Sequence, residues 1–242
     1  PAVARNLESG RSGAVLVDPV QGRAGIRVPP SDFLSRLRGR CDEFCAHLTA
    51  DEIYTGFGRT GRWFACEHAG VVPDLICLGK ALTGGFPLSA CVGRAEVMDR
   101  AWPQATGEAI HTSTFLGHPV GCAMALSQIG EIRSGRLPWR SERLGAFLRA
   151  GLSRMPLPAG LIAEVRGLGL MVGFELRHRD GRPACDTVAG IVGMMLERGF
   201  LVLPEGEHGN VIAFTPPLTI RQSDIWRAVE ALADVLAQIG PE

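Results

Sequence analysis

Four short apolar segments in the first half of the chain predict buried strands. They are residues 14–18, 48–51, 75–78 and 88–92. The first two end in Asp18 and Asp51, and the third is followed by Gly79-Lys80. This pattern is typical of strands whose ends carry functional side chains.

Two helices are expected between and after these strands. The first follows Pro29-Pro30, with Ser31 as its N-cap and an apolar stripe from Phe33 to Cys45. The second begins at Pro119 and runs to about Ile132, because proline is favoured in the first turn of a helix. Alternating strands and helices predict an α/β protein with a largely parallel sheet.

The pattern changes near residues 134–138, which read as a break. Beyond it we expect the helices and strands of a smaller α+β domain. The helices are expected at 140–154, 187–198 and 222–238, and the strands at 170–176, 200–203 and 211–214. The predicted domains are therefore residues 1–134 and residues 135–242.

Charge and composition narrow the classes of function. The chain carries 25 basic and 25 acidic residues, so its net charge gives no electrostatic case for binding nucleic acid or an anionic membrane. No apolar run is long enough for a membrane span, and no signal peptide opens the chain.

The seven cysteines are an odd number without the spacing of a small disulfide scaffold. We therefore expect reduced thiols in a cytoplasmic protein. The cysteines and histidines between residues 41 and 68 lack the paired spacing of a zinc site, so no metal is expected. Cys41 and Cys45 lie four residues apart, which predicts that both pack on the apolar face of the first helix.

Lys80 is the only lysine among the 25 lysine and arginine residues. A lysine amine can lose its proton and form an imine with a carbonyl, whereas a guanidinium stays protonated. With Asp51 it forms a pair that suits pyridoxal phosphate, since Lys80 would form the internal aldimine and Asp51 would keep the pyridine nitrogen protonated. The alternative is a structural ion pair or two unrelated strand ends.

Gly56 to Gly61 match the letters of the dinucleotide fingerprint G-x-G-x-x-G. The residues that follow do not predict the helix N-terminus that a bound pyrophosphate requires. We interpret the stretch as a glycine-rich turn.

Several motifs resemble the class III (subgroup II, ω-type) aminotransferases, and they occur in the family's order over nearly the whole chain. The first two are Asp51-Glu52-Ile53-Tyr54-Thr55-Gly56-Phe57-Gly58-Arg59-Thr60-Gly61 and Gly79-Lys80-Ala81-Leu82-Thr83-Gly84-Gly85-Phe86-Pro87-Leu88. Residues 111–119 are similar to the phosphate-site loop, residues 165–173 to a small-domain motif, and residues 211–220 to the C-terminal strand.

The resemblance implies a fold-type I enzyme that uses pyridoxal phosphate and works as a homodimer with sites shared between subunits. Lys80 matches the Schiff-base lysine and catalytic base, and Asp51 the acid at the pyridine nitrogen. The other matches are Ile53 on a ring face, Tyr54 near the phenolic oxygen, and Ser113 and Thr114 in the loop whose threonine reaches the phosphate of the neighbouring subunit's cofactor.

The implied reaction moves an amino group from an amine or amino-acid donor to a 2-oxo acid. Two alternatives stay open. One is a sister chemistry of the same fold, such as an aminomutase or an amino-acid racemase. The other is a non-catalytic half-subunit of a split enzyme, because the chain resembles only the second half of the family's members and an N-terminal half is expected to be missing.

One departure from the family concerns the substrate. Where relatives often carry an acid and an arginine, this chain has Arg23 and Ala213. We hypothesise that the carboxylate-binding charge has moved to Arg23, a cation that lacks its acidic partner. The alternative is that Arg23 points to solvent and the substrate has no α-carboxylate.

Overall fold

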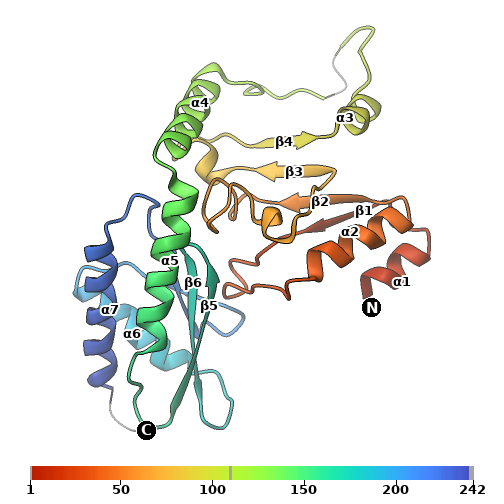
Figure 1. Ribbon diagram of the computed structural model, residues 1–242. Helices are drawn as coiled ribbons and strands as arrows, with labels where there is room; N and C mark the ends of the chain where they lie inside the picture. The colour runs from red at the N-terminus through yellow and green to blue at the C-terminus, as the bar shows by residue number, and fades with distance from the viewer. Residues whose placement is uncertain (1, 109–110, 240–242) are drawn as a thin grey trace. The chain divides into compact units, whose positions relative to one another are not determined.

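A computed structural model describes residues 2–108 and 111–239 (Figure 1). The chain forms two compact units. The first comprises Pro1–Pro19, Pro29–Phe57 and Phe64–Gly135, and the second Val20–Val28, Gly58–Trp63 and Arg136–Glu242. The expected domains were continuous, whereas two short segments of the first half belong with the second unit. They do so because they hydrogen-bond there: Arg166 donates to the carbonyl of Gly25, and the Leu170 N–H donates to that of Arg59.

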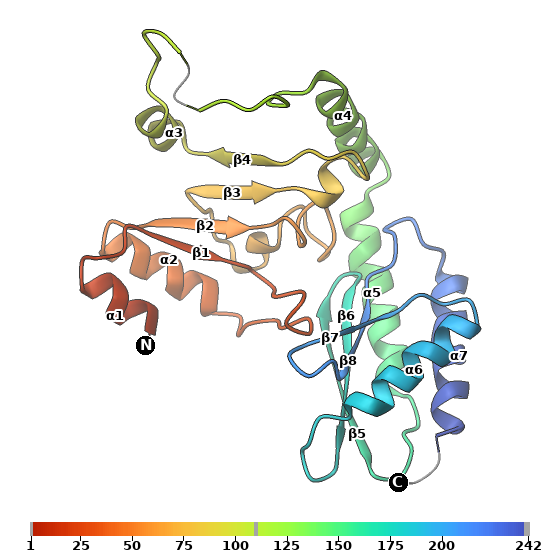
Figure 2. The ribbon, with the colours of Figure 1, turned by 180° about the vertical axis from the view of Figure 1, so that it is seen from behind.

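The first unit is built on a four-stranded sheet with the order β1-β2-β3-β4. Its strands are β1 (Ala14–Val17), β2 (His47–Asp51), β3 (Leu75–Leu78) and β4 (Ala90–Gly93). The first three run parallel, and β4 pairs antiparallel with β3, as the arrows in Figures 1 and 2 show. The prediction of a largely parallel sheet is confirmed.

Helical elements complete the first unit. They are α1 (Ala2–Glu8), α2 (Phe33–Glu43), the 3₁₀ helices η1 (Ala65–Ala69) and η2 (Lys80–Leu82), α3 (Ala95–Ala101) and α4 (Pro119–Ser134). Leu7 of α1 joins Leu34, Leu37 and Cys41 of α2 in one core with Leu48 of β2. This amphipathic packing explains why α2 forms where the apolar stripe predicts it.

Two details of α2 differ from the expectation. Its N-cap is Asp32 rather than Ser31, and no side chain caps it. Cys41 is fully buried, but Cys45 is exposed because the helix ends at Glu43 and Cys45 adopts a positive φ in the following turn. The prediction that both thiols pack in the core is therefore wrong for Cys45.

A buried carboxylate fastens α2 to the sheet. Asp74, just before β3, accepts hydrogen bonds from Arg38 of α2 (2.6 Å) and from the backbone N–H of Leu48 (2.7 Å). Burial alone raises the pKa of Asp74, but these hydrogen bonds and the positive charge of Arg38 hold it below its usual value.

The second unit has an antiparallel sheet with the order β5-β6-β8-β7. Its strands are β5 (Leu161–Leu168), β6 (Met171–His178), β7 (Leu203–Glu205) and β8 (Val211–Phe214). Three helices pack with this sheet around one apolar core: α5 (Leu137–Ser153), α6 (Cys185–Glu197) and α7 (Gln222–Ala237). The expected α+β architecture is confirmed.

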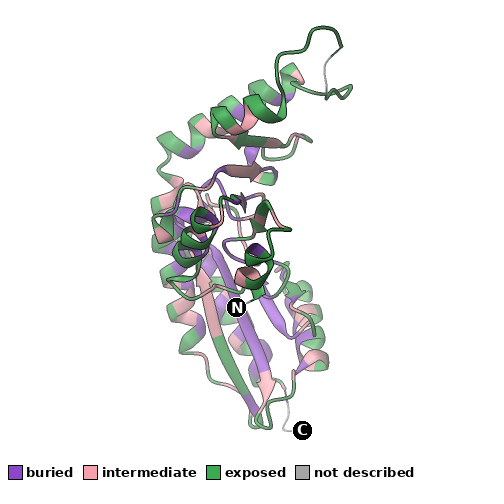
Figure 3. Ribbon diagram, turned by 90° about the vertical axis from the view of Figure 1, so that its right-hand side faces the viewer, coloured by how far each residue is buried: buried purple, intermediate pink, exposed green. Residues whose placement is uncertain are grey.

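Several elements of this unit differ from the sequence prediction. The helix expected at 140–154 begins at Leu137, because Pro138 sits in its first turn, where the missing N–H costs nothing. The strand expected at 200–203 is β7, which lies at 203–205. Strand β5 was not predicted; it is an edge strand with mostly exposed or half-exposed residues, in contrast to buried β6 (Figure 3).

No helix in the described part of the chain combines the length and the apolar character needed to cross a membrane.

Candidate functional site

Three charged side chains stand at the carboxyl ends of the parallel strands. Asp18 follows β1, Asp51 ends β2, and Lys80 lies two residues after β3. Because these strands are parallel neighbours, their carboxyl ends meet at one edge of the sheet. The pKa of the Asp18 carboxyl is raised by its desolvation and by the negative charge of Asp51, while Lys80 lowers it. The three groups therefore share one electrostatic environment.

Lys80 occupies an unusual backbone position. Its φ is +39°, a region that non-glycine residues rarely adopt and that costs on the order of 1–3 kcal/mol. It directly follows Gly79 and opens η2, so the chain turns sharply away from the sheet at this point. The Lys80 Nζ atom lies 4.4 Å from the centroid of the Tyr54 ring. Strain at a residue that the surrounding structure holds in place is typical of functional sites.

The turn after β2 brings Asp51 and Ile53 to the same place. The Asp51 Oδ1 atom accepts a hydrogen bond of 3.0 Å from the backbone N–H of Ile53, which orients the carboxylate. Ile53 also packs closely on the end of β3, since a Cβ atom placed on Gly79 would lie 3.3 Å from its Cγ2 atom. The structure thus brings together Asp51, Ile53, Tyr54 and Lys80.

Glu52 supports this turn from within the core. It is fully buried and accepts hydrogen bonds from the N–H groups of Ala65 (2.9 Å) and Cys66 (2.8 Å) and from the Thr55 hydroxyl. Burial, followed by the negative charge of Glu52, raises the pKa of the Cys66 thiol to about 12. Sequence reasoning missed this residue; the signal was a second acid placed directly after a buried strand.

Residues 53–64 form turns and bends, as predicted for the glycine-rich stretch. The short helix η1 that follows begins with its first N–H groups directed at Glu52 rather than at a ligand. The dinucleotide interpretation therefore gains no support.

Ser113 and Thr114 lie in the segment between α3 and α4, and both are exposed. Among the described residues, neither belongs to the hydrogen-bonded turn around Asp51. A hydroxyl group of an exposed serine or threonine can donate a hydrogen bond to an oxyanion.

Arg23 belongs to the second unit and has an acidic partner there. Its Nη1 atom lies 2.9 Å from the Oε1 atom of Glu205, whose side chain is only 4% exposed, whereas that of Arg23 is 80% exposed. The N–H of Gly206 also donates to the Arg23 carbonyl (3.1 Å). The expectation that Arg23 lacks an acidic partner is therefore wrong. One bond occupies only part of a guanidinium with five N–H donors.

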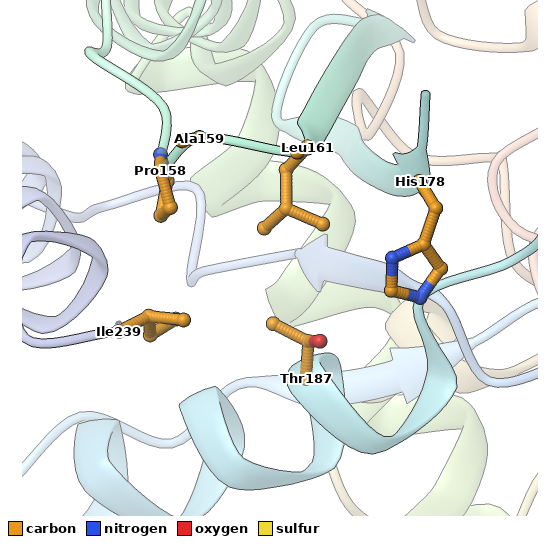
Figure 4. A pocket seen from close by; sticks show the side chains of 7 residues that line it. Pro158, Ala159, Leu161, His178, Thr187 and Ile239 are labelled. Atoms are coloured by element: carbon orange, nitrogen blue, oxygen red, sulfur yellow. The ribbon is translucent and has the colours of Figure 1, made fainter. Parts of the chain in front are cut away.

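Two cavities lie in the second unit. The larger, of about 430 Å³, has mostly apolar walls, including Phe200, Leu203 and Ala213, with the Asp224 carboxylate beside them. The smaller, of about 20 Å³, lies between Leu161, His178, Thr187 and Ile239 (Figure 4). A space of that size holds about one water molecule. Neither cavity contains the charged residues described above.

Within the described residues, no three histidine, cysteine, aspartate or glutamate side chains are arranged to hold a metal ion.

Comparison with known proteins agrees with this arrangement. The profile of the family "Aminotransferase class-III" matches residues 3–236. A 5-aminovalerate aminotransferase of Pseudomonas aeruginosa is 38% identical over 228 residues, which are 93% of this chain and 52% of that protein. A leucine/methionine racemase of Thermococcus litoralis is 40% identical over 93% of this chain and 50% of its own length.

The fold of the chain is also similar to that of a solved transaminase structure. The PLP-bound amine transaminase from an uncultivated Pseudomonas species has a TM-score of 0.85 at 34% identity, over 98% of this chain and 56% of that one. The chain thus spans about half the length of the curated relatives it matches.

Proposed function

Because the chain belongs to the class III aminotransferase family, whose members use pyridoxal phosphate, we propose that it carries the lysine-bearing part of a transaminase. The enzyme moves an amino group from an amine or amino-acid donor to a 2-oxo acid. One observation carries this proposal: the only lysine of the chain stands beside Asp51 at the carboxyl edge of the parallel strands. In this proposal the first unit belongs to the cofactor-binding large domain and the second is the small domain.

The residues of the first unit fit the cofactor by their chemistry. Pyridoxal phosphate supplies an aldehyde that amines can join and a protonated pyridine ring that draws electrons from the reacting carbon. Lys80 holds the aldehyde through its amine. Asp51, oriented by the N–H of Ile53, keeps the ring nitrogen protonated. Ile53 packs on the ring as a stiff β-branched side chain, and the Tyr54 hydroxyl donates to the phenolic oxygen.

Lys80 also does the proton transfer. Once a substrate amine has taken its place, the released amine of Lys80 would act as a free base that removes a proton from the substrate carbon and delivers it to the carbon on the other side of the substrate nitrogen, two bonds away. Its position over the Tyr54 ring keeps the amine near the turn that carries Asp51. Ser113 and Thr114 donate to the phosphate of a neighbouring subunit's cofactor, so the enzyme is a homodimer.

Arg23 binds the carboxylate of the acceptor. Its exposed guanidinium is held at one end by buried Glu205, which leaves further donors for a second carboxylate. The position of Ala213 on β8 supplies no charge of its own. Because Glu205 balances the charge of Arg23, a carboxylate is recognised there through the remaining N–H donors and not through a net positive charge.

The working enzyme contains chain beyond these 242 residues, as part of the same polypeptide or of a partner. In the described residues β1 and β4 are the edges of their sheet, and Leu16 on β1 is 66% exposed. Open edges of this kind pair with further strands or are covered.

The seven free thiols support a cytoplasmic location.

The similarity to a racemase favours a second candidate, in which the substrate carbon loses its proton and regains one on the opposite face, so that one amino acid is inverted. The two functions are separated by incubating the complete protein with a ¹⁵N-labelled amino donor and an unlabelled 2-oxo acid. Transamination moves the label to the acceptor, and Lys80→Arg abolishes the transfer. Conversion of a single L-amino acid to its D-form without a co-substrate indicates the racemase. The absence of both activities in cofactor-loaded protein contradicts the proposal.

A further inference from the structure

A row of three residues crosses the first sheet directly before the carboxyl edge. Asp51 of β2 is the register partner of Cys77 of β3, and Cys77 is the register partner of Cys91 of β4. Directly paired residues on neighbouring strands project to the same face of a sheet. The two thiols and the Asp51 carboxylate therefore occupy one face, with Cys77 in the middle.

The two cysteines satisfy the geometry of a cross-strand disulfide. Opposed residues of antiparallel strands have Cα atoms about 4.5–5.5 Å apart. Disulfides close over Cα separations of about 4.4–6.8 Å. The two thiols are close enough for Cys91 to raise the pKa of Cys77. The backbone can therefore accept the bond without a change of register.

The two thiols differ in exposure. Cys91 is exposed on β4, whereas Cys77 is half-buried. Burial raises the pKa of Cys77, and the neighbouring Cys91 and Asp51 add to this effect. Among the described residues Cys91 is therefore the more accessible of the two thiols, while Cys77 remains protonated until a reactive sulfur stands beside it.

We propose that Cys77 and Cys91 are a reversible redox modification site that forms a disulfide beside Asp51. The Cys91 thiolate attacks a low-molecular-weight disulfide such as glutathione disulfide, forming a mixed disulfide and releasing one thiol. The Cys77 sulfur, giving up its proton, then attacks the sulfur of Cys91 and releases the second thiol. Two protein thiols are oxidised, and one disulfide is reduced to two thiols.

The site is coupled to the functional residues through the backbone. The Cys77 carbonyl accepts a hydrogen bond of 3.0 Å from the N–H of Glu52, and Lys80 follows only three residues later. A disulfide that draws Cys77 toward β4 would therefore shift the backbone that holds Glu52, next to Asp51, and the backbone that leads to Lys80. We expect oxidation to weaken cofactor binding several-fold, an effect that rests on the proposed function. The disulfide itself does not rest on it.

The test treats the complete, folded protein with glutathione disulfide, blocks the remaining thiols and maps the peptides by mass spectrometry. We expect a peptide pair linked through Cys77 and Cys91, no change at the other five cysteines of these 242 residues, and full reversal by dithiothreitol. Cys77→Ser is expected to leave glutathione attached to Cys91, and Cys91→Ser to leave Cys77 unmodified. Cys122→Ser, which removes an exposed thiol on α4, leaves the linked pair unchanged.

Three results would overturn the proposal. They are a glutathione adduct that persists on Cys91 in the unaltered protein, a disulfide between other cysteines, and two thiols at Cys77 and Cys91 that stay unmodified. The peptide map needs neither activity nor a variant, so a fold lost on substitution does not obscure it. If the disulfide forms and the protein proves not to transfer amines, only the proposed function fails.

Discussion

Replacing Glu52 with alanine tests how the turn that carries Ile53 and Tyr54 is held. The fully buried carboxylate accepts two backbone N–H groups and one hydroxyl. Glu52→Ala leaves these donors without an acceptor, and each buried unsatisfied group costs about 1–3 kcal/mol. The variant no longer has to bury the charged Glu52 carboxylate, and this saved desolvation free energy offsets part of the loss. We expect the free energy of unfolding to fall by about 3–5 kcal/mol.

The change is measured by urea unfolding of the complete protein, with Glu67→Ala as the matched control. Glu67 is also a carboxylate that accepts one backbone N–H, from Phe64 at 3.0 Å, but it is exposed, so its loss costs about 0.5–1 kcal/mol. Cofactor affinity should fall in the Glu52 variant and stay unchanged in the control. Equal destabilisation of the two variants would refute the reasoning.

Three further predictions concern the two units. Gly145→Ala is expected to destabilise the protein by several kcal/mol in thermal unfolding, because the added Cβ atom would lie 1.8 Å from a backbone carbonyl oxygen. Its control, Gly190→Ala, lies in open space on α6 and is expected to stabilise the protein by about 0.5–1 kcal/mol. Equal shifts of the two variants would contradict this prediction. Phe174→Ala, in the core of the second unit, is expected to cost about 3–5 kcal/mol in urea unfolding, and a cost below about 1 kcal/mol would contradict its place there. The hydrogen bond from Arg38 holds the pKa of Asp74 below its usual value. The stability that Asp74 contributes is therefore present above its unfolded pKa of about 3.9 and is lost as the pH falls through its folded pKa. Asp74→Asn should make the free energy of unfolding depend less on pH in this acid range, and an unchanged pH profile would contradict the prediction.

The first sheet was largely predictable because its strands are short apolar runs with a sharp polar end. β3 lies where the pattern 75–78 places it, and β1 and β2 differ by one residue at an end. β8, which is fully buried, likewise matches its predicted range of 211–214. β5 escaped prediction because its exposed edge mixes charged and apolar residues, which weakens the alternation.

The candidate site was predictable only where local sequence determines it. Asp51 and Lys80 follow from strand ends, which one segment reveals by itself. The partnership of Arg23 with Glu205 joins residues far apart in the chain, and no periodicity encodes such a pair. The role of Glu52 depends on the N–H groups of η1, whose direction only the folded turn defines.

The most direct test of the account asks which amine holds the cofactor. The complete protein is loaded with pyridoxal phosphate, reduced with borohydride and digested, and the modified peptide is identified by mass spectrometry. We expect a pyridoxyl group on Lys80, the single lysine of these 242 residues, none at this position in Lys80→Arg, and about 10–100-fold weaker cofactor binding in Asp51→Asn. Labelling of any other amine with Lys80 unmodified, or unchanged affinity in Asp51→Asn, would contradict this expectation.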